Sequence, residues 1–276
     1  MLQEHEQEKI KNMEKDIKII FFDVDGTLYD ATSDYVNPTT IKALYELKNK
    51  DIEVVMCTGR GINELNGLPK VLKDFPFDGY VTSGGGEVYY HGEKIFTSYI
   101  DFSIMHSLCP YIYDSFNDID TIFLDINGSG TIAKMRKHGM YNFDWFHQEP
   151  YPIREMDIQH VVHLILCMEV EKYPDIIDLV KDTTYLKSSA YSLEIFAKNI
   201  NKMHGIQQIL HKTNINIEQT MAFGDSENDH EMLMGVHLGV AMGNANEETK
   251  KYASYICDSM WNDGIYKALK FWGIIK

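Results

Sequence analysis

The sequence predicts an α/β protein, in which a Rossmann-like core on a parallel sheet is interrupted by an inserted α+β domain. Short apolar runs alternate with helical segments in the first and last thirds of the chain, as in strand–helix–strand units. Closely spaced strand-like runs fill the middle third, which is typical of hairpins. Two distant apolar runs end in acidic residues, and ligands of open α/β sheets bind outside the carboxyl ends of the strands.

The first core strand is the apolar run Ile19–Phe22, which is followed by Asp23, Asp25 and a Gly turn. A short apolar run bounded by turn residues is typical of a buried parallel strand. The two carboxylates are therefore expected at the ligand-binding edge of the sheet. An Asp-Gly turn also ends strands that have no site nearby, so this segment alone leaves both interpretations open.

A helix and two further strands are expected in the next sixty residues. Asn37-Pro38 forms a helix start, with Asn at the cap and Pro in the first turn. One strand, at 52–57, ends in Thr58-Gly59-Arg60, and another lies at 80–82. Strand, helix and strand at this spacing predict a right-handed parallel crossover.

The inserted domain is expected at residues 86–190. Its strand-like runs are separated by only a few turn residues, which predicts hairpins in an α+β module. The core is then discontinuous, at 17–85 and 191–276, and residues 1–16 form a tail or a frayed helix. The strand-like runs of the insert are Glu87–Tyr90, Lys94–Phe96, Thr121–Leu124 and Val161–Met168.

The last third of the chain returns to alternating helices and strands. These elements are expected after Gly205, at 221–223, 231–234, 238–242 and 247–252. The segment Gly224–Asp229 repeats the plan of the first strand, because acidic residues follow a short apolar run. Two strands far apart in the sequence thus end in acid clusters.

The composition argues against several classes of partner. The 276 residues are 44% hydrophobic and carry a formal net charge of -15. This charge argues against nucleic acid and against an anionic membrane, since both bind basic surfaces. Any anion site must be made locally, from a metal ion and a few cationic side chains.

The sequence also predicts a cytoplasmic location. The four cysteines lie far apart, without the spacing of a zinc site or a disulfide framework. The segment Met1–Asp16 lacks the apolar region of a signal peptide, and no run approaches the ~20 apolar residues that span a bilayer. A monomer or a weak homo-oligomer is expected.

Carboxylates and a lysine near the strand ends predict phosphoryl transfer to and from a small molecule. Asp23 comes last on its strand and is expected to attack phosphorus, which forms an aspartyl-phosphate. Asp25 is expected to protonate the leaving oxygen and later to deprotonate water. Lys202 would place a positive charge near the phosphoryl oxygens, although a lysine taken alone is usually solvated.

The same carboxylates predict a Mg²⁺ site. Hard oxygen ligands in this number suit Mg²⁺, which neutralises charge during phosphoryl transfer. Asp23 and Asp225 are expected to bind the ion together with the backbone carbonyl of Asp25. Asn228 and Asp229 would support these ligands or add to them.

The turn after the second core strand predicts contacts to the substrate phosphate. The Thr58 hydroxyl and the Gly59 amide would donate hydrogen bonds as charge moves in the transition state. Arg60 would contact the phosphate or support the groups that do. The alternative for Thr58 and Arg60 is an ordinary strand-end turn with a surface arginine.

Four segments resemble the four ordered motifs of the haloacid dehalogenase superfamily: Asp23–Leu28, Thr58–Arg60, Lys202–Ile206 and Gly224–Asp229. The insert between the second and third motifs looks like the type IIB cap of the Cof-like subfamily, which Val240–Ala245 and Asp263–Ile265 also resemble. The resemblance covers nearly everything from Ile17 to the end. It implies a Mg²⁺-dependent phosphatase of small phosphorylated metabolites, often sugar phosphates, with the residue roles given above.

The chain departs from the subfamily at two places. Gly84-Gly85-Gly86 stands where the subfamily usually has Asn-Gly-Ala, which puts a hinge or substrate contact in doubt. Met203 and His204 separate the lysine and the glycine of the third motif. Neither departure removes a reacting group. The three glycines are also expected to form a flexible joint between the domains.

Two other functions are alternatives. A sugar phosphomutase would use the same aspartyl-phosphate and would interconvert sugar phosphates without releasing phosphate. A regulator that binds phosphometabolites without turnover should lack at least one reacting group, whereas all are present here. The sequence does not identify the physiological substrate.

Several aromatic and histidine side chains outside the motifs are expected to be structural. The aromatic cluster at 141–147 is expected in the core of the insert rather than as a lid over a sugar ring. His160 and His163 bracket an apolar strand without a partner at zinc-ligand spacing. His204 and His230 are expected on helix surfaces, because the carboxylates already fill the acid and base roles.

Overall fold

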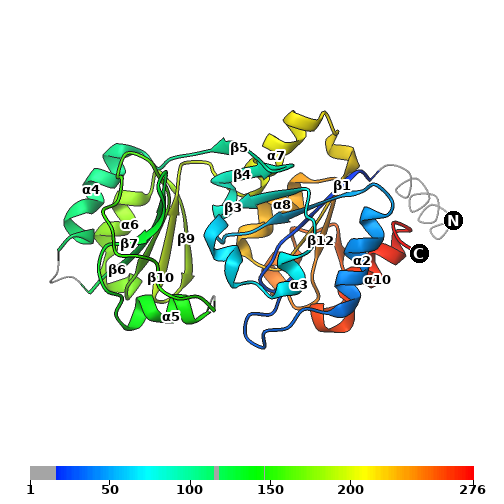
Figure 1. Cartoon of the computed structure of the whole chain (residues 1–276), viewed down its shortest axis with the longest axis horizontal. Helices are drawn as coiled ribbons and strands as arrows, with labels where there is room; N and C mark the ends of the chain where they lie inside the picture. The colour runs from blue at the N-terminus through cyan, green and yellow to red at the C-terminus, as the bar shows by residue number, and fades with distance from the viewer. Residues whose placement is uncertain (1–16, 115–117, 146) are drawn as a thin grey trace.

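A computed structural model describes residues 17–114, 118–145 and 147–276. The chain forms two β-sheets, one of eight strands and one of five, which lie beside each other along the long axis of the molecule (Figure 1). The expected N-terminal tail at 1–16 and Phe146 of the aromatic cluster lie outside the described residues. In the described part of the chain, no helix combines the length and the apolar character needed to cross a membrane.

The eight-stranded sheet has the order β13-β12-β11-β1-β2-β3-β4-β5. Its strands pair in parallel from β13 to β3, and β4 and β5 complete the sheet as antiparallel strands. This arrangement confirms the predicted α/β fold. The strands are β1 (Ile19–Phe22), β2 (Glu53–Cys57), β3 (Gly79–Thr82), β4 (Glu87–Tyr90), β5 (Glu93–Thr97), β11 (Thr220–Gly224), β12 (Leu238–Ala241) and β13 (Tyr255–Ile256).

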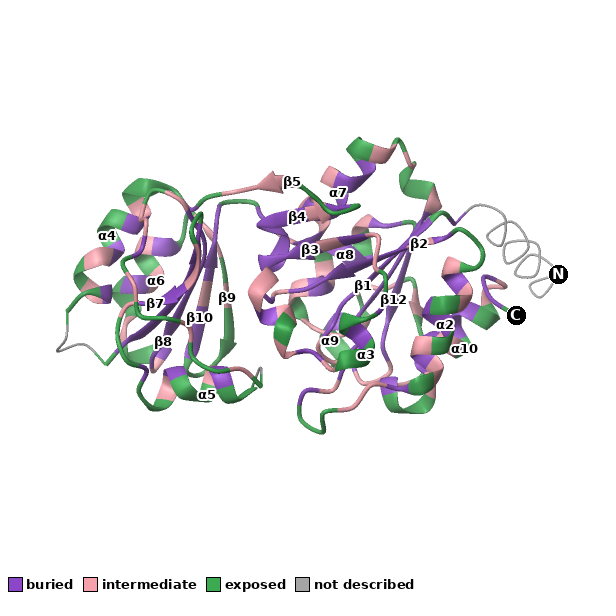
Figure 2. Cartoon of the chain, in the orientation of Figure 1, coloured by how far each residue is buried: buried purple, intermediate pink, exposed green. Residues whose placement is uncertain are grey.

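Helices cover both faces of this sheet, so its central strands are buried on both sides (Figure 2). This burial explains why β1 reads as a continuous apolar run rather than an alternating one. The predicted helix start is confirmed, because the Asn37 side chain accepts a hydrogen bond from the Thr39 amide at 3.0 Å. The helices are α2 (Pro38–Lys48), α3 (Lys70–Lys73), α7 (Lys202–Thr213), α8 (His230–Gly235), α9 (Glu247–Lys250) and α10 (Gly264–Phe271).

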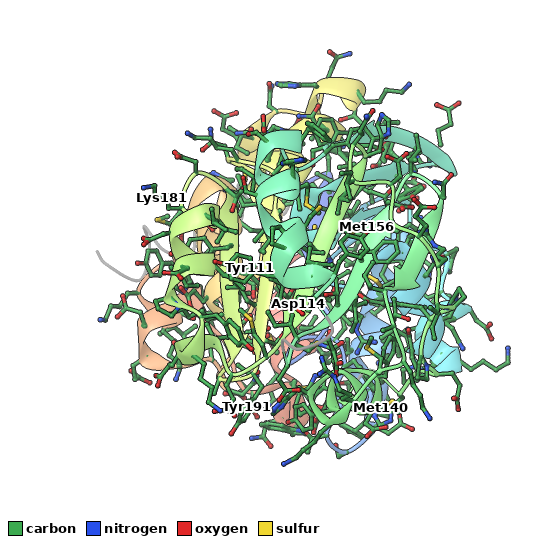
Figure 3. The ribbon with its side chains drawn as sticks, turned by 90° about the vertical axis from the view of Figure 1, so that its left-hand side faces the viewer. Tyr111, Asp114, Met140, Met156, Lys181 and Tyr191 are labelled. Atoms are coloured by element: carbon green, nitrogen blue, oxygen red, sulfur yellow. The ribbon has the colours of Figure 1, made fainter. Side chains whose placement is uncertain are left out.

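The five-stranded sheet is antiparallel, in the order β7-β6-β8-β10-β9. Helices α4 and α6 pack side by side on one of its faces, as Figure 3 shows from that end of the molecule. Helix α5 packs against part of the other face through Phe143 and Ile165. We call this sheet and its three helices the cap. Its elements are α4 (Phe102–Ile112), β6 (Asp120–Asp125), β7 (Gly128–Thr131), α5 (Lys137–Trp145), β8 (Val161–Cys167), α6 (Pro174–Val180), β9 (Thr184–Ser189) and β10 (Ser192–Phe196).

The change from one sheet to the other falls at different residues from the expected boundaries at 86 and 190. Strands β4 and β5 pair with β3 in the eight-stranded sheet, and β10 pairs with β8 in the cap. Antiparallel pairing extends the core sheet past its parallel part, and a hairpin there has the same sequence pattern as a hairpin in the insert. We retain the two-domain division as a proposal, with the cap as the inserted domain.

The three glycines lie between β3 and β4, two neighbouring strands of the eight-stranded sheet, in the short 3-10 segment Ser83–Gly85 and the residue after it. Gly85 has a φ of +104°, and a Cβ built there would lie 2.1 Å from the carbonyl oxygen of Asn201. The segment is therefore tightly packed against the start of α7. Its role as a flexible joint stays a prediction.

We predict that Gly85→Ala lowers the free energy of unfolding by about 3 kcal/mol or more, because the new Cβ collides with backbone at a strained φ. Gly92→Ala is the matched control, since Gly92 has a φ of +82° but nothing within 4 Å of its Cβ position. In the control, the free energy of unfolding should fall by only about 1–2 kcal/mol, the cost of the strained backbone alone. Urea unfolding measures both values, and equal losses in the two variants would contradict the packing argument.

Candidate active site

Three parallel strands end at the same level and bring the predicted residues together. Strand β1 lies between β2 and β11, with Phe22 paired to Met56 on one side and to Phe223 on the other. Asp23 directly follows β1, Thr58 directly follows β2 and Asp225 directly follows β11. The carboxyl edge of the sheet therefore carries the site that the sequence predicts there.

Asp23 has one oxygen held and one oxygen free. Its side chain is buried, and its Oδ1 accepts a hydrogen bond from Lys202 Nζ at 2.5 Å. The other oxygen, Oδ2, is buried and has no hydrogen-bond partner among the described residues. Burial and the nearby carboxylate of Asp229 raise the pKa of Asp23 well above its usual value. A buried acceptor without a partner is a position at which a metal ion or a reacting group can bind.

Lys202 is buried at the first residue of α7, with 1% of its surface exposed, so the solvated-lysine alternative is wrong. Its Nζ donates to Asp23 Oδ1, to Asp229 Oδ1 at 2.6 Å and to Asn228 Oδ1 at 3.1 Å. Burial alone would lower the pKa of Lys202, but the carboxylates of Asp229 and Asp23 outweigh it and raise that pKa. Lys202 is therefore a fixed cation that joins the first and fourth motifs.

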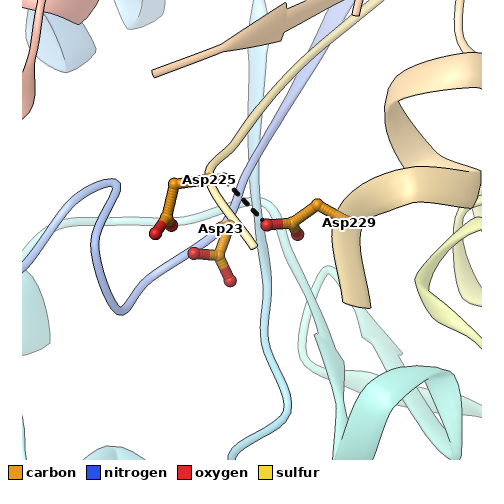
Figure 4. Close-up of side chains that lie close together, drawn as sticks. All are labelled: Asp23, Asp225 and Asp229. Carbon is orange, nitrogen blue, oxygen red and sulfur yellow. Dashed lines mark hydrogen bonds between the residues drawn. The ribbon is translucent and has the colours of Figure 1, made fainter. Parts of the chain in front are cut away.

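Both carboxylate oxygens of Asp229 accept hydrogen bonds. Its Oδ1 binds Lys202, and its Oδ2 accepts from the backbone amides of Asp225 at 2.9 Å and Ser226 at 3.0 Å (Figure 4). These contacts fix the loop after β11 in the conformation that turns Asp225 toward Asp23. Asn228 adds to this network, since its Oδ1 also accepts from the Ser226 hydroxyl at 2.9 Å.

Asp225 faces Asp23 across the turn that follows β1. Its Oδ1 accepts a hydrogen bond from the Thr27 hydroxyl at 3.0 Å. Burial is the main cause that raises the pKa of Asp225, to about 7, and the nearby carboxylate of Asp229 adds to the shift. Gly26 has a φ of +90°, and a Cβ there would lie 2.2 Å from Asp225 Oδ2. Only glycine lets the turn pass this close to the carboxylate.

The carboxylates fit a divalent cation. Asp23, Asp225 and Asp229 each offer an oxygen, and these three atoms lie within 4.8 Å of one another. One lysine faces three carboxylates, so the cluster holds excess negative charge, which adds to burial in raising the pKa values of Asp23 and Asp225. Oxygen donors alone favour a hard cation.

Arg60 binds Asp25. The guanidinium donates from Nη2 to Asp25 Oδ1 at 2.6 Å and from Nε to Oδ2 at 2.8 Å, a bidentate pair. Arg60 is buried, with 2% of its surface exposed, so the surface-arginine alternative is wrong. Thr58 completes this turn, since its Oγ1 accepts from the Arg60 amide at 3.0 Å and its own hydroxyl proton stays available. The pair orients Asp25, which lines the adjoining cavity.

A cavity of about 340 Å³ separates these residues from the cap. The core side includes Asp23, Asp25, Thr58, Gly59, Arg60, Glu64 and Asn228, and the cap side includes Trp145, His163, Ile165, Leu186, Lys187, Ser188 and Glu194. The sequence analysis missed the cap residues, although a charged residue within each apolar strand, His163 in β8 and Glu194 in β10, is a signal that could have found them.

The aromatic cluster divides between core and cavity. Phe143 is buried in the cap core, as expected, whereas Trp145 is half-exposed and lines the cavity. Tyr141 is exposed at the surface. The expectation of core packing is therefore confirmed for Phe143 and wrong for Trp145 and Tyr141. Only one face of helix α5 packs against the sheet, so residues on its other faces stay exposed.

The cap contacts the core beside the cavity. His147 Nε2 lies 2.8 Å from the carbonyl oxygen of Ala31, and Gln148 donates to the carbonyl oxygen of Glu64 at 2.5 Å. Asn63 of the core donates to Ser129 of β7 at 3.1 Å. The cavity is thus bounded by polar contacts between the two parts.

Comparisons with known proteins agree with this geometry. A family profile described as haloacid dehalogenase-like hydrolase matches residues 20–269. The chain is 28% identical to a 5-amino-6-(5-phospho-D-ribitylamino)uracil phosphatase of Bacillus subtilis (strain 168), over 95% of this chain and 98% of the relative.

Solved structures give the same result. A HAD subclass IIB sugar phosphatase is 27% identical, has a TM-score of 0.82, and is matched over 94% of this chain and all (100%) of that chain. A second structure, reported for a trigonal-bipyramidal intermediate in a phosphoryl-transfer superfamily, is 27% identical with a TM-score of 0.83 and the same coverage. The fold of this chain thus matches solved phosphoryl-transfer proteins over nearly its whole length.

We predict that Asp225 makes the metal-free protein less stable as pH rises. The pKa of Asp225 is about 7 in the folded state, against 3.8 for an unperturbed aspartate, so between these pH values the folded state binds one more proton than the unfolded state. The free energy of unfolding should then fall from about pH 4 to pH 7 and stay low above it. In EDTA at pH 8, Asp225→Asn should melt higher than the parent by on the order of 1 kcal/mol, about 2–4 °C.

Thermal melts with EDTA or Mg²⁺ at pH 5 and pH 8 measure this effect. Mg²⁺ should stabilise the parent at pH 8 and leave Asp225→Asn nearly unchanged. An Asp225→Asn variant that melts lower than the parent in EDTA at pH 8 would contradict the prediction.

We also predict that Lys202→Met destabilises the metal-free protein by about 3–5 kcal/mol at pH 8, because it leaves two buried carboxylates without their cation. The loss should shrink at pH 5, because the raised pKa of Asp23 favours the protonated, uncharged form of that carboxyl. Lys198→Met is the matched control, since Lys198 is exposed and pairs only loosely with Asp182 at 3.4 Å. Urea unfolding at both pH values tests this, and a loss within 1 kcal/mol or so of the control would contradict it.

Proposed function

The chain belongs to the haloacid dehalogenase-like hydrolase family and is a phosphatase, and we propose that it hydrolyses small phosphorylated metabolites, sugar phosphates among them, with Mg²⁺ bound and through a phosphorylated Asp23. The observation that carries this proposal is the free Oδ2 of Asp23, buried at the wall of the cavity while Lys202 holds Oδ1. The names of the relatives differ in substrate, so the sugar-phosphate class is the part that needs measurement.

Asp23 is the proposed nucleophile. Its Oδ2 forms a bond to phosphorus as the bond from phosphorus to the leaving oxygen breaks, which gives an aspartyl-phosphate and a free alcohol. Lys202 fixes the other oxygen, so the carboxylate cannot rotate away from the cavity. Water then attacks the phosphorus and releases phosphate and the free carboxylate.

Asp25 is the proposed acid and base. It would give a proton to the leaving oxygen in the first step and take one from water in the second. Arg60 occupies both carboxylate oxygens, so Asp25 must give up at least one of these hydrogen bonds when it transfers a proton. Arg60 is therefore proposed as the residue that positions Asp25, in place of the phosphate contact expected from the sequence.

Asp23, Asp225 and the backbone carbonyl of Asp25 are the proposed Mg²⁺ ligands. Bound Mg²⁺ would neutralise the negative charge that the carboxylates and a phosphoryl group bring together. Asp229 supports the ligands, because both of its oxygens are committed to Lys202 and to backbone amides.

The Thr58 hydroxyl and the Gly59 amide are the proposed donors to the phosphoryl oxygens. Both residues line the cavity beside Asp23, and the Thr58 hydroxyl keeps its proton free for donation. The cytoplasmic location and the monomeric or weakly associated state stay predictions.

We predict that phosphate release from a panel of sugar phosphates and other phosphometabolites requires both Mg²⁺ and Asp23. EDTA should abolish release, and Asp23→Asn should lower kcat by about 1,000-fold or more, because the nucleophile is lost. Asp182→Asn is the control, since that side chain is 69% exposed and lies in the cap away from the site.

Each other result has a distinct meaning. Unchanged release by Asp23→Asn would contradict the covalent mechanism. Interconversion of sugar phosphates without net release would favour the phosphomutase alternative. A folded parent that turns over no compound, yet binds one, would favour the regulator.

A further inference from the structure

The cap places two titratable side chains, His163 and Glu194, on the sheet face that lines the cavity. His163 of β8 pairs with Phe196 of β10, and Ile165 pairs with Glu194. His163 and Glu194 are therefore diagonal neighbours on the same face of two adjacent strands. Alternate residues of a strand share a face, which puts His163 beside Ile165 and toward the cavity. Charged groups are rarely buried in such a face unless they have a partner or a role.

His163 is buried beside Glu194. Only 3% of its surface is exposed, and its ring stacks on Phe196 at a centroid distance of 4.4 Å and an angle of 22°. Its Nε2 lies 3.2 Å from Glu194 Oε2 but makes no hydrogen bond among the described residues. The stack fixes the ring, and a hydroxyl bound between His163 and Glu194 would give this nitrogen the hydrogen bond that it lacks.

The charge of the cavity restricts what a ligand can carry. Glu64, Glu194 and Glu227 all line it beside the site carboxylates. Burial raises the pKa of Glu64, whose Oε2 accepts from the Gly61 amide at 2.6 Å, so a further negative charge nearby is unfavourable. Of the cations at the wall, Arg60 is committed to Asp25 and Lys187 is exposed.

Hydroxyl groups match this lining. A hydroxyl donates to a carboxylate and accepts from an imidazole N–H, so neighbouring hydroxyls satisfy both Glu194 and His163. Trp145 and Ile165 supply apolar surface for the carbon skeleton between them. A second phosphate or a carboxylate on the substrate would instead face the glutamates.

We propose that His163 and Glu194 bind hydroxyl groups of the leaving group and select neutral, polyhydroxylated phosphomonoesters over esters that carry a second anion. The proposal rests on the proposed function, because it assigns the part of the substrate that leaves Asp23. His163 and Glu194 are then specificity-determining residues.

The parent enzyme is tested first with matched pairs of esters: fructose 6-phosphate against fructose 1,6-bisphosphate, and glucose 6-phosphate against 6-phosphogluconate. Fructose 1,6-bisphosphate carries a second phosphate, and 6-phosphogluconate carries a carboxylate on an open chain in place of the glucose ring. The neutral member should have a kcat/KM higher by about 10-fold or more. Equal values, or a preference for the second anion through Lys187, would overturn the proposal.

Variants then test the two residues. His163→Phe keeps a ring to stack on Phe196 but removes both nitrogens, and should lower the ratio of kcat/KM for fructose 6-phosphate to that for p-nitrophenyl phosphate by about 10- to 100-fold. Glu194→Gln removes only the charge and should reduce the difference in kcat/KM between fructose 6-phosphate and fructose 1,6-bisphosphate. The exposed cap variant Glu171→Gln should keep both parent ratios. Equal losses on every ester would show a structural role and overturn the proposal.

Binding separates this proposal from the proposed function. If the parent releases phosphate from no ester, the proposed function fails, and calorimetry with fructose 6-phosphate on Asp23→Asn still tests the cap. Weaker binding by about 10-fold or more when His163→Phe is added supports the proposal. No binding to Asp23→Asn, or equal binding by both proteins, overturns it.

Discussion

The Lys202 ammonium, held among three oxygens, is the interaction on which the site depends. It touches Asp23 after β1, Asp229 after β11 and Asn228 of the same loop, three positions that only the fold brings together. Without this cation the two buried carboxylates would repel each other and move or protonate. With it, the end of β1 and the loop after β11 are locked to the start of α7. Lys202 therefore holds these core segments together and also fixes the geometry of the site.

The site holds more negative charge than its lysine neutralises. Burial is the main cause of the raised pKa values of Asp23 and Asp225, and the neighbouring carboxylates add to it. The whole chain carries a net charge of -15. Such an arrangement lowers the stability of the metal-free protein and raises its affinity for a divalent cation. Stability and function thus oppose each other at Asp225, where the residue best suited to the fold would be uncharged.

The sequence was sufficient to predict which residues lie at the strand ends, but it was insufficient to predict which side chains contact one another there. Apolar runs followed by acids predicted Asp23 and Asp225 at one edge, because strand direction and parallel pairing fix that position. They did not predict that Arg60 is buried on Asp25, since that contact depends on how two turns fold. They did not place β4 and β5 in the core sheet either, because a hairpin has the same pattern in any sheet.

The cap shows why selection can change without loss of the fold. The face of β8 and β10 that carries Leu164, Leu193 and Ile195 is buried against α4 and α6 and holds the cap together. His163 and Glu194 project from the opposite face and line the cavity. Because strand residues alternate between faces, a substitution at either position alters the cavity and leaves the buried face intact. The strand geometry thus separates the residues that stabilise the cap from those proposed to choose its substrate.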